Sequence, residues 1–219
     1  MSDRTLRTHT DTVAAEGLDD WRWMLRALHA RFRTGDFVTG LRLATAITEA
    51  AEEMDHHPDL DLRYPHLNVR LSSHDVGGVT DRDLRLARRI SELAAEAGVA
   101  ADPASVQVLE LALDTADLER VRPFWLAALG MSETASPDEL VDKGGSLPTL
   151  WFQETDPHDE PRQRFHVDIT VPPEVAPGRI EAALAAGGTL VSAAREPAFT
   201  ILADAEGNKA CVCTSAGRD

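Results

Sequence analysis

The sequence predicts an α+β protein made of two domains, and three observations support this fold class. Both halves of the chain contain segments in which apolar and polar residues alternate, as in half-buried strands, beside segments with apolar residues at helical spacing. The composition breaks once, at residues 98–105, where small residues and Pro103 follow a helical stripe. The second half repeats one order of elements, a strand, a helix and further strands. We therefore expect domains at residues 1–99 and 104–219.

Composition sets limits on partners and location. The chain has 219 residues, 43% of them hydrophobic, which suffices for a core in each domain. Its 22 Lys and Arg against 37 Asp and Glu give a net charge of −15 without a basic run, so nucleic acid and anionic membranes are poor partners. No apolar stretch approaches the roughly 18 residues of a membrane span, and Met1–Gly17 lacks an apolar signal core. We expect a cytoplasmic protein.

The first elements are a strand pair or a helix, followed by a long helix. Residues 21–32 fit strand alternation and also a helical stripe, and periodicity alone does not decide between them. Asp36 is a candidate N-cap for a helix whose apolar residues recur at helical spacing. These residues are Phe37, Leu41, Ala44, Ile47, Ala51 and Met54. The His56-His57-Pro58 run ends this helix, because proline cannot continue it.

A strand and a second helix complete the first half. Leu67–Leu71 alternates as a half-buried strand, and His74 follows close behind it. Thr80 is the candidate N-cap of a helix with an apolar stripe from Leu84 to Ala97. Gly98 suits the C′ position of that helix.

Three histidines and a carboxylate, His56, His57, His74 and Asp83, fall within this short unit. Imidazole titrates near neutral pH, and the negative end of a helix favours imidazolium by about 0.3–1 kcal/mol, so the group suits acid–base catalysis. Each residue also has a plain structural explanation. The adjacent histidines suit a hydrophilic helix end, His74 suits an exposed loop, and Asp83 suits the N3 position of a capping box. The histidines also suit metal binding, but no Glu or Cys completes a familiar zinc spacing.

Residues 21–93 resemble the pterin-4a-carbinolamine dehydratases. The resemblance rests on segments in the family's order and spacing: Asp55-His56-His57-Pro58, Tyr64, the strand Leu67–Leu71, Ser73-His74, Gly77-Gly78 and Thr80–Asp83. It implies a small domain with helices on one face of an antiparallel sheet. It also favours a hairpin at Trp21–Arg33, although Arg26-Ala27 offers no Gly or Asn for a tight turn.

The resemblance also implies an activity, that of a hydro-lyase. Such an enzyme removes water from a 4a-hydroxytetrahydropterin, such as 4a-hydroxytetrahydrobiopterin, to give quinonoid dihydropterin. The implied catalytic residues, in which the carboxylate orients or charges one imidazole, are His56, His57, His74 and Asp83. The implied pterin-binding residues are Asp55, Pro58 and Ser73. No cofactor and no metal are expected, the identity of the acid stays open, and we expect a homo-oligomer. The alternative is a pterin-fold protein that binds and regulates without turnover.

The second half consists of two successive sets of a strand, a helix and further strands. The expected strands are residues 108–113, 149–153, 165–171, 189–192, 199–202 and 210–213. The first helix begins at Asp117 and ends at Gly130, and the second begins at Pro177 and ends at Gly187.

Four side chains in these strands have predictable environments. Trp151 and Phe152 point to opposite faces of one strand, so we expect one of them in the core. Cys211 and Cys213 share one face of the last strand, which suits two buried thiols and does not suit a disulfide between them.

From about Ser105 to Thr214 the chain resembles the glyoxalase-like members of the vicinal oxygen chelate superfamily. The resemblance rests on residues 110–120, 124–130, 164–169 and 204–208 and implies two paired βαβββ units.

The second resemblance also bears on metal binding. Metal-using members place a His, Gln or Glu in the first strand, a His at the start of the second unit and a Glu in the last strand. Glu110 and His166 match this pattern, whereas Cys211 occupies the last position, and a thiolate shifts preference toward softer metals. We therefore expect a polar cup that binds an unidentified small ligand without a metal. A metal-dependent lyase or dioxygenase and a purely structural domain are the alternatives.

Overall fold

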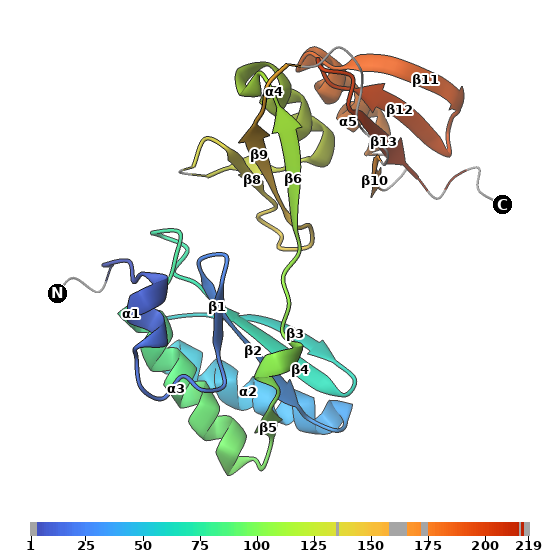
Figure 1. Cartoon of the computed structure of the whole chain (residues 1–219). Helices are drawn as coiled ribbons and strands as arrows, with labels where there is room; N and C mark the ends of the chain where they lie inside the picture. Colours follow the sequence, from blue (N-terminus) through green and yellow to red (C-terminus); the bar gives the residue numbers. More distant parts are fainter. Residues whose placement is uncertain (1–3, 135, 158–165, 172–174, 215, 217–219) are drawn as a thin grey trace. The chain divides into compact units, whose positions relative to one another are not determined.

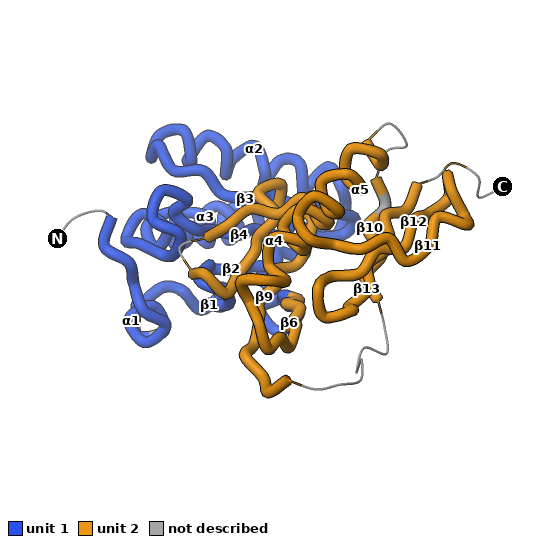
Figure 2. The backbone as a smooth tube through the Cα atoms, turned by 90° about the horizontal axis from the view of Figure 1, so that it is seen from above, with its two compact units in different colours: residues 1–108 blue, residues 109–219 orange. Residues whose placement is uncertain are grey.

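The computed structural model describes residues 4–134, 136–157, 166–171, 175–214 and 216. The chain divides into two compact units, Met1–Val108 and Leu109–Asp219 (Figure 1, Figure 2). Within the described ranges, no helix combines the length and the apolar character that a membrane span requires. Both units mix helices with strands, so the predicted α+β class is confirmed.

The first unit is an antiparallel sheet covered by helices. Its strands are β1 (Arg22–Met24), β2 (Ala27–Arg33), β3 (Asp59–Arg63), β4 (His66–Leu71) and β5 (Ala100–Ala101), and its helices are α1 (His9–Val13), α2 (Phe37–Glu53) and α3 (Asp81–Glu96). The strand order is β1-β2-β4-β3, and β5 also pairs with β2. Alternate residues of β2 and β4 share one core with α2 and α3, which confirms the predicted sheet with helices packed on it.

The helix α2 begins where the sequence predicts, but its buried face differs from the predicted stripe. Asp36 is the N-cap, and its carboxylate accepts a hydrogen bond from the Thr39 amide at 2.8 Å. The buried residues are Gly40, Leu43, Ile47, Ala50 and Ala51. Phe37 and Leu41, expected on the inner face, are 50% and 54% exposed. The inner face is therefore rotated relative to the predicted stripe, and it includes Gly40, which lies close to the Leu62 side chain.

The first two strands form the predicted hairpin through an unusual turn. Met24 lies opposite Ala27, so the connection has two residues, Leu25 and Arg26. Both have positive φ angles, +44° and +59°, the conformation that a tight hairpin turn requires and that Gly or Asn adopts more readily.

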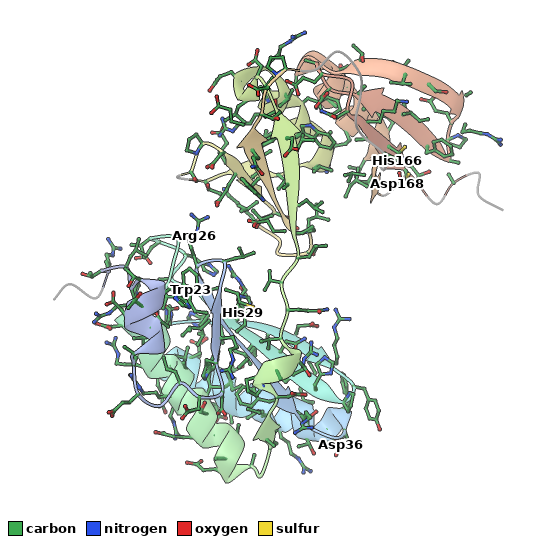
Figure 3. The ribbon with its side chains drawn as sticks, in the orientation of Figure 1. Trp23, Arg26, His29, Asp36, His166 and Asp168 are labelled. Atoms are coloured by element: carbon green, nitrogen blue, oxygen red, sulfur yellow. The ribbon has the colours of Figure 1, made fainter. Side chains whose placement is uncertain are left out.

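His29 lies in the same hairpin, where Figure 3 labels it with Trp23 and Arg26. Its Nε2 lies 3.2 Å from the carbonyl oxygen of Met24. Burial lowers the pKa of His29 to about 4, with a contribution from Arg70, so the ring is neutral at physiological pH.

The segment expected to connect the two halves contains structure of its own. β5 pairs with the end of β2, at Phe32 and Arg33, and a 3₁₀ helix follows at Pro103–Ser105. The Asp102 amide donates a hydrogen bond to the Arg31 carbonyl at 2.7 Å. The first unit therefore includes residues beyond Val99.

The second unit consists of two βαβββ repeats. The first contains β6 (Glu110–Thr115), α4 (Leu118–Leu129), β7 (Ser132–Glu133), β8 (Glu139–Val141) and β9 (Thr149–Glu154), and the second contains β10 (Val167–Thr170), α5 (Ala176–Ala185), β11 (Thr189–Arg195), β12 (Phe199–Ala203) and β13 (Lys209–Cys213). The strand orders are β6-β9-β8-β7 and β10-β13-β12-β11, with the first strand of each repeat parallel to the last. The predicted pair of repeats is confirmed. Phe165, the expected start of β10, lies outside the described residues.

The two repeats share a core in which α4 packs against α5. Trp125 is buried there, and its Nε1 donates a hydrogen bond to Asp204 at 2.9 Å. Asp204 also accepts hydrogen bonds from the amides of Glu206 and Asn208, which gives the 204–208 segment its turn. Phe152 is buried, as expected for one of the two adjacent aromatic residues.

Candidate functional site

The centre of the site in the first unit is the carboxylate of Asp83, in the first turn of α3. Thr80 is the N-cap, and Asp83 completes the capping box by accepting a hydrogen bond from the Thr80 amide at 2.7 Å. Asp83 Oδ1 lies 2.8 Å from His56 Nε2, and Oδ2 accepts a hydrogen bond from Ser73 Oγ at 2.7 Å. One buried carboxylate therefore joins the segments that follow α2 and β4 to the start of α3.

Asp83 remains ionised although its side chain is fully buried. Burial would by itself raise its pKa, but hydrogen bonds from His56, Ser73 and the Thr80 amide outweigh burial and hold the pKa below its ordinary value of 3.8. A carboxylate only accepts hydrogen bonds, so Nε2 of His56 carries the proton in their pair.

The end of α2 fixes the backbone of His56. The Asp55 amide donates to the Glu52 carbonyl at 3.2 Å, and the His56 amide donates to the Ala51 carbonyl at 3.1 Å. These two bonds, with Met54 as the C-cap, form a Schellman motif. Asp55 occupies the left-handed position at φ +46°, so this expected pterin-binding residue also terminates the helix.

The other two histidines face solvent. The side chain of His57 is 56% exposed, and its Nε2 lies 3.1 Å from Glu52 Oε1. His74 is exposed in a loop that is closed by a hydrogen bond from the Ser73 amide to the Gly78 carbonyl. Each histidine directly follows a residue bound to the Asp83 carboxylate, His57 after His56 and His74 after Ser73.

The structure thus joins His56, Ser73 and Asp83 by direct hydrogen bonds, and these bonds do not include His57, His74, Asp55 or Pro58. Two participants were not expected from the sequence. The hydroxyl of Thr80 lies 2.8 Å from Ser73 Oγ, and Glu52 contacts His57. The capping pattern gave a signal for Thr80, whereas a contact from Glu52 across the end of a helix has none.

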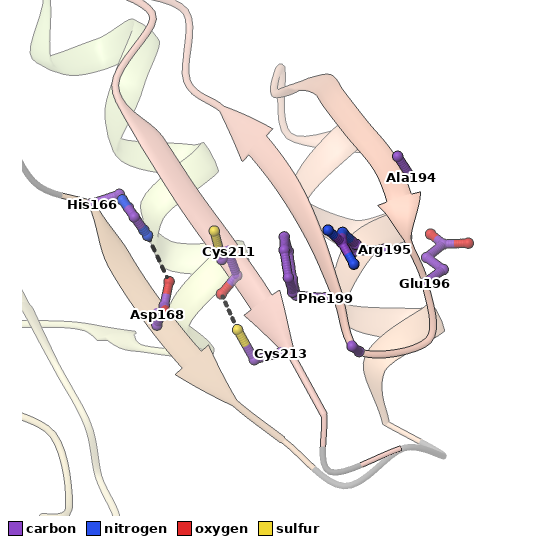
Figure 4. A pocket seen from close by; sticks show the side chains of 9 residues that line it. His166, Asp168, Ala194, Arg195, Glu196, Phe199, Cys211 and Cys213 are labelled. Atoms are coloured by element: carbon purple, nitrogen blue, oxygen red, sulfur yellow. Dashed lines mark hydrogen bonds and ion pairs between the residues drawn. The ribbon is translucent and has the colours of Figure 1, made fainter. Parts of the chain in front are cut away.

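In the second unit, a cavity of about 660 Å³ opens over the sheet of the second repeat. Its lining residues are His166, Asp168, Ala194, Arg195, Glu196, Ala198, Phe199, Cys211 and Cys213 (Figure 4). Glu110, which the sequence paired with His166, is not among these residues and lies on β6, in the other sheet. Asp168 contacts both His166 and Cys211 and was not singled out from the sequence.

Both cysteines of the second unit are free and buried, as expected. Burial raises the pKa of the Cys211 thiol to about 12, and a hydrogen bond to the Asp168 carboxylate adds to the effect. Cys211 is therefore a protonated thiol at neutral pH.

Two family models match the chain, one in each unit. Residues 5–93 match the model for pterin 4 alpha carbinolamine dehydratase, and residues 110–213 match a glyoxalase-like domain. A protein of *Metallosphaera sedula*, named provisionally as a pterin-4-alpha-carbinolamine dehydratase, is 41% identical over 80 residues. That match covers 36% of this chain and 83% of the relative.

Two solved structures are similar to parts of the chain. A transcriptional coactivator/pterin dehydratase from *Brucella melitensis* has 29% identity and a TM-score of 0.40, covering 41% of this chain and 99% of that protein. A glyoxalase/bleomycin resistance protein/dioxygenase family enzyme from *Burkholderia phytofirmans* has 19% identity and a TM-score of 0.39, covering 48% and 95%.

Proposed function

We propose a dehydratase activity for this chain, which belongs to the pterin 4 alpha carbinolamine dehydratase family through its first unit. The proposed reaction removes water from a 4a-hydroxytetrahydropterin and gives the quinonoid dihydropterin. One observation carries the proposal. His56 is held on the buried Asp83 carboxylate, and the exposed His57 and His74 each follow a residue that this carboxylate binds.

The reaction needs one proton donor and one proton acceptor. The C4a–O bond breaks as an imidazolium protonates the hydroxyl, which leaves as water. A neutral imidazole takes the proton from N5 as the C4a=N5 double bond forms. Each proton transfer by a positioned side chain contributes about 10²–10⁴-fold to the rate.

Exposure divides the three histidines between two roles. A substrate in solution can reach the rings of His57 and His74, so we assign them the proton transfers. His56 is only 7% exposed, and its Nε2 is engaged by Asp83. We assign His56 and Asp83 to holding the two loops in place.

The test is the rate of dehydration of a 4a-hydroxytetrahydropterin by the full-length chain and its variants. His57→Ala and His74→Ala should each lower kcat by about tenfold or more with circular dichroism unchanged. His66→Ala is the matched control, because His66 lies on β4 outside these contacts, and it should keep the wild-type rate. A chelator should leave all these rates unchanged.

Two results would contradict the proposal. Wild-type rates in both the His57→Ala and the His74→Ala protein would remove acid–base catalysis by these residues. A wild-type protein that binds a tetrahydropterin but does not accelerate dehydration would instead be a pterin-binding protein without turnover.

A further inference from the structure

The pairing of two strands in the second unit places three unlike metal-binding side chains on one face. β10 runs parallel to β13, and Asp168 lies directly opposite Cys211 in their register. His166 directly precedes β10, and its imidazole contacts the Asp168 carboxylate, so the two side chains lie on the same side. Figure 4 shows the three side chains on these two neighbouring strands, among the residues that line the cavity.

The donor atoms of these side chains are close together. His166 Nε2 lies 3.1 Å from Asp168 Oδ1, and one ligand atom from each of His166, Asp168 and Cys211 lies within 4.8 Å of the other two. In tetrahedral zinc sites with Zn–N and Zn–O near 2.0 Å and Zn–S near 2.3 Å, ligand atoms are roughly 3.3–3.8 Å apart. Small side-chain rotations therefore suffice to bring the three donors around one ion.

We propose that His166, Asp168 and Cys211 form a zinc site with an open fourth position. An imidazole, a carboxylate and a thiolate are all ligands that zinc accepts, and the thiolate favours zinc over Mg²⁺, Ca²⁺ and Mn²⁺. As the Zn–S bond forms, the Cys211 thiol releases its proton to solvent, so zinc binding should be weaker at lower pH. Three protein ligands beside a cavity are typical of sites that keep one position for water or a small oxygen-donor molecule. The cavity supplies the space for that fourth ligand.

This donor set differs from the one that the glyoxalase-like resemblance implies. The family pattern would use Glu110 with His166, and Glu110 lies outside both the three-residue cluster and the lining of the cavity. With Cys211 in the last position, the hard oxygen donors expected for Fe²⁺ or Mn²⁺ are incomplete. Asp168 supplies the missing third donor from the neighbouring strand.

Two of the three side chains are accessible to ions from solvent, and the third is buried. The side chains of His166 and Asp168 are 54% and 55% exposed, whereas Cys211, opposite Asp168 on the neighbouring strand, is buried. Phe199 and Arg195 form other parts of the cavity wall. An arriving ion would meet the imidazole and the carboxylate first and the sulfur last.

Metal content and calorimetry test the proposal on the full-length chain purified without a histidine tag. After treatment with a chelator and its removal, titration with Zn²⁺ should give one ion bound per chain. Co²⁺ in place of zinc should give a sulfur-to-cobalt charge-transfer band in the absorption spectrum, which reports the thiolate directly. His166→Ala, Asp168→Asn and Cys211→Ser should each weaken zinc binding by more than about tenfold, and Cys211→Ser should also remove the band.

Two variants serve as controls that keep the fold and the neighbourhood. Cys213→Ser changes the other cysteine of the cavity, and Glu110→Gln changes the residue of the family pattern; both should bind zinc like the wild type. Thermal melts without metal should be alike for all five variants. The proposal is overturned if the wild type binds no zinc, or if Cys211→Ser binds zinc and keeps the cobalt band. It is also overturned if Glu110→Gln loses the metal while Asp168→Asn retains it.

Discussion

At the scale of single residues, Asp83 connects the stability of the first unit to its candidate site. The same carboxylate caps α3 and holds His56 and Ser73, and it is buried while charged. Leaving a buried charge without its partners is costly, by about 3–5 kcal/mol when a buried ion pair is broken. The local hydrogen bonds at the helix start therefore stabilise the fold and also set the orientation of an imidazole.

The lowered pKa of Asp83 predicts how stability depends on pH. A carboxyl whose pKa is lower in the folded state adds stability above its unfolded pKa, 3.8, and this contribution is lost as pH falls through the folded value. Urea unfolding between pH 7 and pH 2 should show a loss below about pH 4. Asp83→Asn should be less stable at pH 7 and should lose less stability over the acid range. An equal acid loss in the variant would assign the effect to other carboxylates.

At the scale of elements, the hairpin turn between β1 and β2 stores local strain. Leu25 and Arg26 both adopt left-handed conformations, which cost an ordinary residue about 1–2 kcal/mol each. We predict that the double substitution Leu25→Asn, Arg26→Gly raises the free energy of unfolding by about 1 kcal/mol or more. Urea denaturation measures this, with Leu25→Ala as the control that keeps the strain. If the Asn-Gly protein has an unchanged or lowered free energy of unfolding, contacts of the Leu25 and Arg26 side chains offset the strain of the turn.

The elements that the sequence predicts well are those with local signals. Asp36, Thr80 and Asp117 are all N-caps in the structure, because a helix start depends on a few neighbouring residues. β3 was not predicted, since it is an edge strand with little burial on either face, and β5 is only two residues long. β3 therefore lacked the burial pattern by which a strand is predicted, and β5 lacked the length.

The candidate sites also differ in whether local sequence patterns indicate them. The contact of His56 with Asp83 is consistent with a resemblance that covers both motifs. The cluster around Asp168 depends on the register of β10 against β13, two strands separated by a helix and two other strands. No local sequence pattern predicts that register. The glyoxalase-like resemblance therefore indicated Glu110, and not Asp168, as the partner of His166.

At the scale of the whole molecule, each unit has its own core and its own sheets. We expect residues 1–108 and 109–219 to fold as separate proteins, each with a cooperative thermal transition. A fragment of residues 1–99 lacks β5 and the Asp102–Arg31 hydrogen bond. Its Tm should be about 4–8 °C below that of residues 1–108 for each kcal/mol lost. Circular dichroism measures both transitions, and an unfolded 1–108 or 109–219 fragment would mean that the units depend on each other.

The parallel pairing of first and last strands has a consequence for the chain as it is synthesised. Among the described residues, β6 pairs with β9 alone and β10 with β13 alone, so β6 can pair only after β9 has been made, and β10 only after β13. Until then β6 presents Leu111 and Leu113 without a sheet partner, although α4 can already form. When strands that are far apart in the sequence pair late, folding is slower and apolar strand edges stay exposed for longer. Nascent chains of this protein would therefore carry an unpaired strand during two intervals, one before each closing strand leaves the ribosome.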